Sequence, residues 1–125
     1  MSIPVDVADL AKALEDFGAG YLLTTSAERT VKVVTVEPAV VGDVVVVEAP
    51  GAGTLRNLAG HAAVTLVFPP AEPRGFTLLV DGTAAVDGHD VRVTPTGAVL
   101  HRPASHADGP PPPDGCGHDC APVGA

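Results

Sequence analysis

Residues 21–47 read YLLTTSAERTVKVVTVEPAVVGDVVVV, and this stretch decides the fold class. It contains three runs of β-branched and apolar residues, at 21–25, 31–36 and 44–47, with turn-forming residues between them. Such runs are typical of β-strands, because branched side chains pack well on a pleated surface. We therefore expect three consecutive strands here, paired in antiparallel fashion.

Two short helices are expected to interrupt the strands. Apolar residues recur at helical spacing from Val7 to Phe17, and Asp6 is placed to cap this helix. A second helix is expected over 54–59, after a glycine-rich turn. Further strands are expected at 64–68, at 76–86 with a bulge at Gly82, and at 91–93 and 98–100 on either side of a break at 94–97. Many short strands with regularly spaced turns predict a mainly β protein, a small β-barrel with short helices.

The composition bounds the function. The chain has 125 residues, of which 46% are hydrophobic, so we expect one packed domain, over residues 1–102. The formal net charge of −8 excludes a broad cationic surface, and we expect no nucleic-acid partner. No apolar run is long enough to cross a bilayer, and the N-terminus does not read as a signal peptide. We therefore expect a cytoplasmic protein with no membrane partner.

A Pro/Gly-rich C-terminal tail is expected over residues 103–125, because it lacks the large apolar side chains of a core. Prolines 110–113 favour an extended conformation, and any order in the tail is expected to depend on a contact. Cys116, His118 and Cys120 are soft and borderline ligands suited to zinc or another transition metal. A reversible disulfide, a redox thiol pair and a simple accessible end are the alternatives.

The order of these elements resembles the FMN-binding split barrels of the pyridoxamine 5′-phosphate oxidase-like superfamily. The resemblance covers roughly residues 5–102 and depends on order rather than on any catalytic signature. The segments that carry it are YLLTT at 21–25, VKVVTV at 31–36, RNL at 56–58, HAAV at 61–64 and LVDGTA at 79–84.

The resemblance implies a homodimer with two FMN sites at the subunit interface. It places the flavin ring along the second strand and the phosphate between the end of the third strand and the helix that follows. The cofactor-binding residues implied are Lys32, Val33, Val34, Thr35, Glu48, Ala49, Thr54, Arg56 and Asn57.

The residues themselves permit this site. A phosphate needs hydrogen-bond donors and a cation, and Arg56, Thr54 and the free amides at a helix start provide both. Arg56 is the first choice for the cation, with Lys32 and Arg29 as alternatives. A deazaflavin ranks below FMN as the cofactor, because its polyanionic tail needs a more basic groove.

The resulting functional hypothesis is a small FMN-dependent oxidoreductase that acts on a small-molecule substrate, with the redox chemistry supplied by the cofactor. No catalytic residue is assigned. His101, at the end of the last strand, is a candidate for proton transfer or for a structural hydrogen bond. A non-catalytic flavin or ligand carrier and a metal-binding module that uses the tail are the alternative functions.

Overall fold

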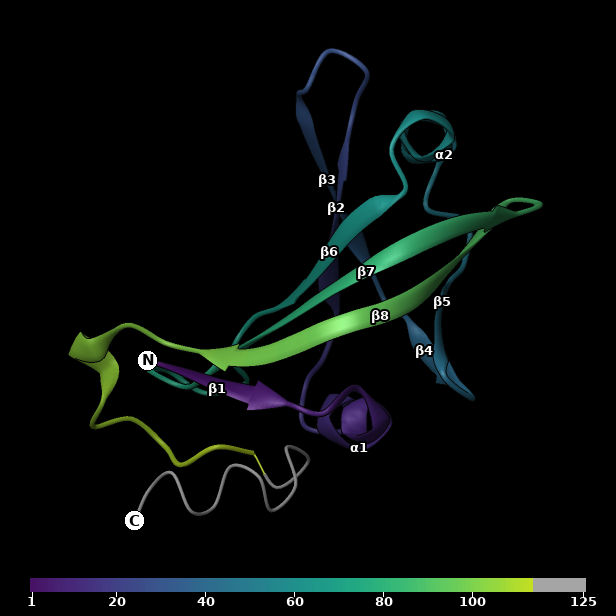
Figure 1. The fold of residues 1–125 in the computed structure, drawn as a ribbon. Coiled ribbons are helices and arrows are strands. Elements are labelled where there is room, and N and C mark those ends of the chain that lie inside the picture. The colour runs from purple at the N-terminus through teal and green to yellow at the C-terminus, as the bar shows by residue number, and fades with distance from the viewer. Residues whose placement is uncertain (114–125) are drawn as a thin grey trace.

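The computed structural model describes residues 1–113, and Figure 1 shows a twisted antiparallel sheet with two short helices. The helical segments are η1 (Val7–Asp9), α1 (Leu10–Leu14), α2 (Ala52–Gly60) and η2 (Ala104–His106). The strands are β1 (Ser2–Val5), β2 (Gly20–Thr25), β3 (Val31–Val36), β4 (Ala39–Val41), β5 (Val44–Val47), β6 (Ala63–Phe68), β7 (Thr77–Asp87) and β8 (Asp90–His101). The predicted mainly β class is confirmed. Over this part of the chain, neither helix has the length and hydropathy of a bilayer-crossing segment.

Strand β8 organises the sheet. The strands follow the order β3-β2-β6-β7-β8-β5-β4, and every pairing is antiparallel. One edge of β8 pairs with β7 along its whole length. The other edge is shared, because β5 pairs with Val91 to Val93 and β1 pairs with Ala98 to His101. A single long strand therefore joins the two halves of the sheet.

The ladder between β7 and β8 shifts its register next to Gly82. Asp81 pairs with Gly97, whereas Gly82 pairs with Pro95, so that one residue of β8 is left over. The predicted irregularity at Gly82 is confirmed. The break predicted at 94–97 is wrong, because β8 continues through it: the shift absorbs the extra residue, and the long pairing with β7 overrides the local proline and glycine signal.

The N-terminal half differs from expectation in its pairing. β2 and β3 form the expected hairpin, but β5 pairs with β4 and β8 rather than with β3. The expected helix from Val7 to Phe17 is shorter and is divided into η1 and α1, with Asp6 accepting a 3.0 Å hydrogen bond from the amide of Ala8. β1 and β4 were not predicted.

The inner face of the sheet encloses one hydrophobic core. Every second residue of the long strands is buried, as expected for a sheet with one face against the core. Helix α1 adds Leu10 and Ala13, and α2 adds Leu58. The fully covered side chains include Leu22, Val45, Val47, Leu66, Leu78, Val80, Val91, Val93 and Leu100.

Residues 103–113, which we call the strap, lie against the end of the sheet and are held there by Arg102. The guanidinium of Arg102 is buried and lies over the ring of Phe76, 4.0 Å from its centroid. Its Nη1 donates to the carbonyl of Pro110 at 2.7 Å. A buried cation is costly unless polar groups surround it, so the strap carbonyls are part of what keeps this arginine inside the protein.

A second contact holds the middle of the strap. Nε of Arg74 donates to the carboxylate of Asp108 at 2.9 Å. Gly109 packs so closely on the carbonyl of Arg74 that a Cβ atom there would collide with it. These contacts are the kind on which the order of this Pro/Gly-rich segment was expected to depend. Residues 114–125 lie outside the described part of the chain.

We expect Gly82→Ala to destabilise the protein by about 1–3 kcal/mol, the usual cost of an added methyl group in a packed site. A Cβ atom on Gly82 would lie 2.6 Å from Cγ1 of Val93 and 2.7 Å from the carbonyl oxygen of Thr94. Gly97 is the matched control, because a Cβ atom there meets nothing within 4 Å. Urea denaturation of both variants tests this; equal stabilities would contradict the close approach at Gly82.

Candidate functional site

The start of helix α2 has no side-chain cap. Its N-cap is Gly51, whose φ of 112° lies in a region that favours glycine, and no side chain accepts a hydrogen bond from the first turn. The first amides of a helix have no partner within the helix, and its dipole places partial positive charge there. A helix of nine residues with an uncapped start is therefore a place for an anion or another acceptor.

Lys32 of β3 lies across this helix start. A Cβ atom placed on Gly53 would lie 3.0 Å from Cε and 3.3 Å from Nζ of Lys32, so glycine leaves the room that the lysine occupies. Within residues 1–113 the ammonium of Lys32 has no ion-pair partner. A cation beside the positive end of a helix is electrostatically unfavourable. An anion bound between the ammonium of Lys32 and the start of α2 would be attracted by both positive groups and would offset their repulsion.

Thr54 and Arg56 are on the same helix but in different environments. The side chain of Thr54 is fully buried, and its Oγ1 has no hydrogen-bond partner in the described part of the chain. A buried hydroxyl without a partner costs roughly 1–3 kcal/mol. The first turn of α2 therefore has two kinds of donor without a side-chain acceptor, the buried hydroxyl of Thr54 and the uncapped amides. Arg56 is exposed, and no acid of the described residues pairs with it, including Glu48.

Asn57 is used to hold the helix. Its Nδ2 donates to Oγ1 of Thr24 in β2 at 3.0 Å, and Thr24 is itself buried. Thr24 pairs with Lys32 across the β2–β3 ladder. The bond between Asn57 and Thr24 therefore fixes α2 against the strand pair that carries Lys32. Sequence reasoning did not single out Thr24, because a threonine inside a strand has no motif of its own.

A groove of about 460 Å³ lies between the end of β3 and the turn that leads to α2. It brings together three predicted residues, Thr35, Glu48 and Ala49, and it adds Glu37, which was not predicted. Ala49 has a φ of 40°, an unfavourable conformation for a residue other than glycine, and its amide donates to Oδ1 of Asp90 at 3.0 Å. Asp90 thus helps to hold the turn that forms one wall.

The predicted residues of β3 are divided between two faces. Lys32 and Val34 alternate with Val33 and Thr35, so the side chains of the four do not share one surface. In the described sheet β3 pairs only with β2, which leaves its other edge unpaired. Successive residues of a strand also direct their backbone groups to opposite edges, so only alternate residues of the four offer them to the unpaired edge.

The other predictions have different outcomes. Oγ of Ser2 lies 3.1 Å from Nδ1 of His101, so this histidine makes a structural contact at the end of β8 that is joined to β1. Cys116, His118 and Cys120 lie outside the described residues, and metal binding by them stays a prediction. Residues 1–113 themselves contain no cluster of three metal-ligating side chains.

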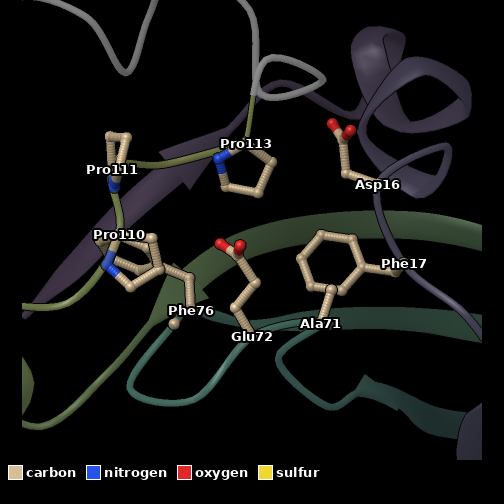
Figure 2. A pocket seen from close by; sticks show the side chains of 9 residues that line it. Asp16, Phe17, Ala71, Glu72, Phe76, Pro110, Pro111 and Pro113 are labelled. Carbon is tan, nitrogen blue, oxygen red and sulfur yellow. The ribbon is translucent and has the colours of Figure 1, made fainter.

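A second hollow, of about 330 Å³, lies between the strap and the body (Figure 2). The rings of Phe17 and Phe76 and the prolines of the strap form its walls, and Asp16 and Glu72 also line it. None of the residues implied for the cofactor lines it. Figure 1 places the strap and helix α2 at different ends of the molecule, so this hollow is separate from the groove.

Comparison with known proteins gives the family. No family model matches the chain. An uncharacterized protein of Mycobacterium bovis and one of Mycobacterium tuberculosis are each 39% identical to it, over 93% of this chain and 92% of their own length. The chain therefore belongs to one family with these two mycobacterial proteins.

Solved structures give the fold. A putative pyridoxamine 5′-phosphate oxidase of Listeria innocua has a TM-score of 0.61 at 10% identity, over 75% of this chain and 96% of its own. An FAD-binding protein of Mycobacterium smegmatis has a TM-score of 0.60 at 19% identity, over 82% of this chain and 100% of its own. An F420 reductase has a TM-score of 0.58 at 19% identity, over 69% of this chain and 92% of its own. The protein thus has the split-barrel fold of these structures, which is the fold that the resemblance predicts.

We expect Asn57→Ala to destabilise the protein by about 1–3 kcal/mol, because it leaves the buried hydroxyl of Thr24 without its donor. The double variant with Thr24→Val removes both polar partners and should cost less than the sum of the two single changes. Chemical denaturation of the four proteins measures this coupling, and strict additivity would show that the hydrogen bond contributes nothing.

Proposed function

We propose that the protein binds FMN and works as a homodimeric, cytoplasmic oxidoreductase on a small-molecule substrate. The observation that carries the proposal is the ammonium of Lys32, which has no ion-pair partner among residues 1–113 and lies beside the uncapped start of α2. Both groups attract an anion, and a flavin phosphate carries close to two negative charges. The residues present therefore fit a phosphate group.

The length of β3 supports a flavin nucleotide rather than a free phosphate. Thr35, at the groove, follows Lys32 by three residues, or about 10 Å along an extended strand. A ribityl phosphate chain has a comparable reach, so a phosphate at Lys32 would leave the flavin ring near the groove. The unpaired edge of β3 offers the backbone donors and acceptors of alternate residues along this path.

The charge of the groove favours FMN over larger cofactors. The names of two structural neighbours mention FAD and F420, which carry more phosphate or carboxylate groups than FMN. Among the described residues, those that line the groove include Glu37 and Glu48 and no basic side chain. A second phosphate or an anionic tail there would meet like charges, whereas the single phosphate of FMN requires only the helix end.

In this proposal the protein binds and orients, and the cofactor supplies hydride and electron transfer. Lys32 and the α2 amides hold the phosphate, with Arg56 as a second cation on the exposed side of the helix. Asn57 keeps the helix in place through Thr24. Glu48 and Ala49 form a wall of the groove whose position is maintained by Asp90.

A homodimer is supported by the outer face of the β2–β3 hairpin. Tyr21, Val31 and Val33 are 40%, 61% and 53% exposed, which is unusual for neighbouring large apolar side chains. Leu23, which pairs with Val33, lies on the same face. A second copy of the chain would cover this face beside the free edge of β3, where the resemblance places the subunit interface.

We expect Lys32→Met to weaken FMN binding by about 1.5–3 kcal/mol, the range for a lost charge-assisted contact, and Arg56→Ala to do the same. Lys12→Met is the matched control, because Lys12 is an exposed lysine on α1 with no role in this site. Titration of apoprotein with FMN, followed by flavin fluorescence, measures all three. Wild-type affinity in both site variants would place the phosphate elsewhere.

Turnover separates an enzyme from a carrier. Photoreduced holoprotein mixed with candidate acceptors should be reoxidised faster than free FMN if the protein is an oxidoreductase. Reoxidation no faster than that of free FMN would count against enzymatic activity and favour a carrier.

We expect Val33→Lys to convert the protein to a monomer, because it places a charge in the apolar face that the second copy would cover. Sedimentation equilibrium of the wild type and the variant measures this. Glu28→Lys, an exposed change in the turn between β2 and β3, should remain dimeric. A wild-type monomer at all concentrations would refute the dimer.

A further inference from the structure

The groove carries negative charge that no described basic side chain offsets. Glu37 directly follows β3 and Glu48 directly follows β5, so the two carboxylates come to the groove from different strands. Both are exposed, and within residues 1–113 neither has an ion-pair or side-chain hydrogen-bond partner. Asp90, which adds a third carboxylate to this region, is bound to the amide of Ala49.

Reduction changes the charge of a flavin. The oxidised ring is neutral, and when it takes up two electrons and one proton it becomes an anion, so the reduced cofactor has one more negative charge than the oxidised one. Charges near the ring nitrogens therefore alter the electron affinity of a bound flavin. Carboxylates oppose the reduced form, because like charges repel most strongly where solvent screening is incomplete.

The geometry points to Glu37 and Glu48 as residues that lower the reduction potential of the flavin bound in this groove. The inference rests on the proposed function. The two carboxylates destabilise the reduced cofactor relative to the oxidised one, so the oxidised form is held more tightly. The bound flavin is then a stronger reductant, and an electron acceptor that is neutral or cationic approaches the groove more readily than an anionic one.

The position of the acids distinguishes this role from that of the cations. Lys32, in β3, lies five residues before Glu37, which follows that strand, and is placed at the helix start, where the phosphate would bind. The cations thus act on the phosphate, whose charge does not change on reduction. The acids act on the groove, where the charge does change.

The experiment measures the midpoint potential of FMN-loaded protein by equilibration with a reference dye at low ionic strength. Glu37→Gln and Glu48→Gln should each raise the potential, and the double variant should raise it further. We expect the double variant to change the ratio of oxidised-form to reduced-form affinity about tenfold, which corresponds to about 30 mV for a two-electron couple. Added salt should reduce the difference, because both acids are exposed.

Two further variants serve as controls. Glu28→Gln removes a carboxylate from the turn between β2 and β3, away from the groove, and should leave the potential unchanged. Glu37→Asp keeps the charge and should keep the potential low, which separates charge from any change in packing. Circular dichroism and the affinity for oxidised FMN verify that each variant is folded and loaded.

The outcomes separate the two proposals. If FMN binds to the wild type but both glutamine variants keep its potential, the role of the acids is refuted and the flavin site stands. If Glu28→Gln raises the potential as much as the groove variants, the effect is one of net charge and the assignment is again refuted. If FMN does not bind to the wild type at all, the proposed function fails, and this inference fails with it.

Discussion

The close approach of β7 and β8 at Gly82 is the constraint on which the rest of the sheet depends. With no Cβ atom at this position, Val93 and Thr94 come close enough for the ladder to shift its register while pairing continues on both sides. The shift lets one strand serve two neighbours, with β5 beside the first part of β8 and β1 beside the last. A larger residue would force the two strands apart at the point where the two halves of the sheet are joined.

This arrangement determines where the sheet ends. Because β5 is taken by β8, it does not pair with β3, and β3 keeps an unpaired edge facing the turn that leads into α2. Unpaired strand edges are liabilities in folded proteins unless something covers them. The unpaired edge of β3 lies beside Lys32, the uncapped start of α2 and the groove. In the proposed function, a bound nucleotide and a second subunit would together cover this edge. The strap covers a different part of the molecule, where Arg102 keeps its charge inside by using backbone carbonyls.

The sequence was informative wherever the signal was local. The runs that became β2, β3 and β6 were long and β-branched, and Gly82 stood out inside an apolar strand. It was less informative where distant partners decide the outcome. Pro95 and Gly97 are typical of a strand break, but the pairing with β7 keeps them in the strand. Residues 103–113 lack large apolar side chains that would predict an ordered position, and the polar contacts of Arg102 and Arg74 hold them instead. In the site, Lys32 and Arg56 were predicted from the family resemblance together with their charge. Glu37 and Thr24 were missed because only folding brings them to the groove and the helix.

The sequence by itself determined the mainly β class, the hairpin of β2 and β3, the glycine-rich entry to α2 and the shortage of basic residues, since each of these follows from residue type and spacing. Only the tertiary structure decided that β5 leaves β3 for β8, that Lys32 lies over Gly53, and that Glu37 and Glu48 share one groove. The physical reason is that strand partners and opposed charges are chosen by competition among distant segments for the same core and the same edges, and no local pattern contains the result of that competition.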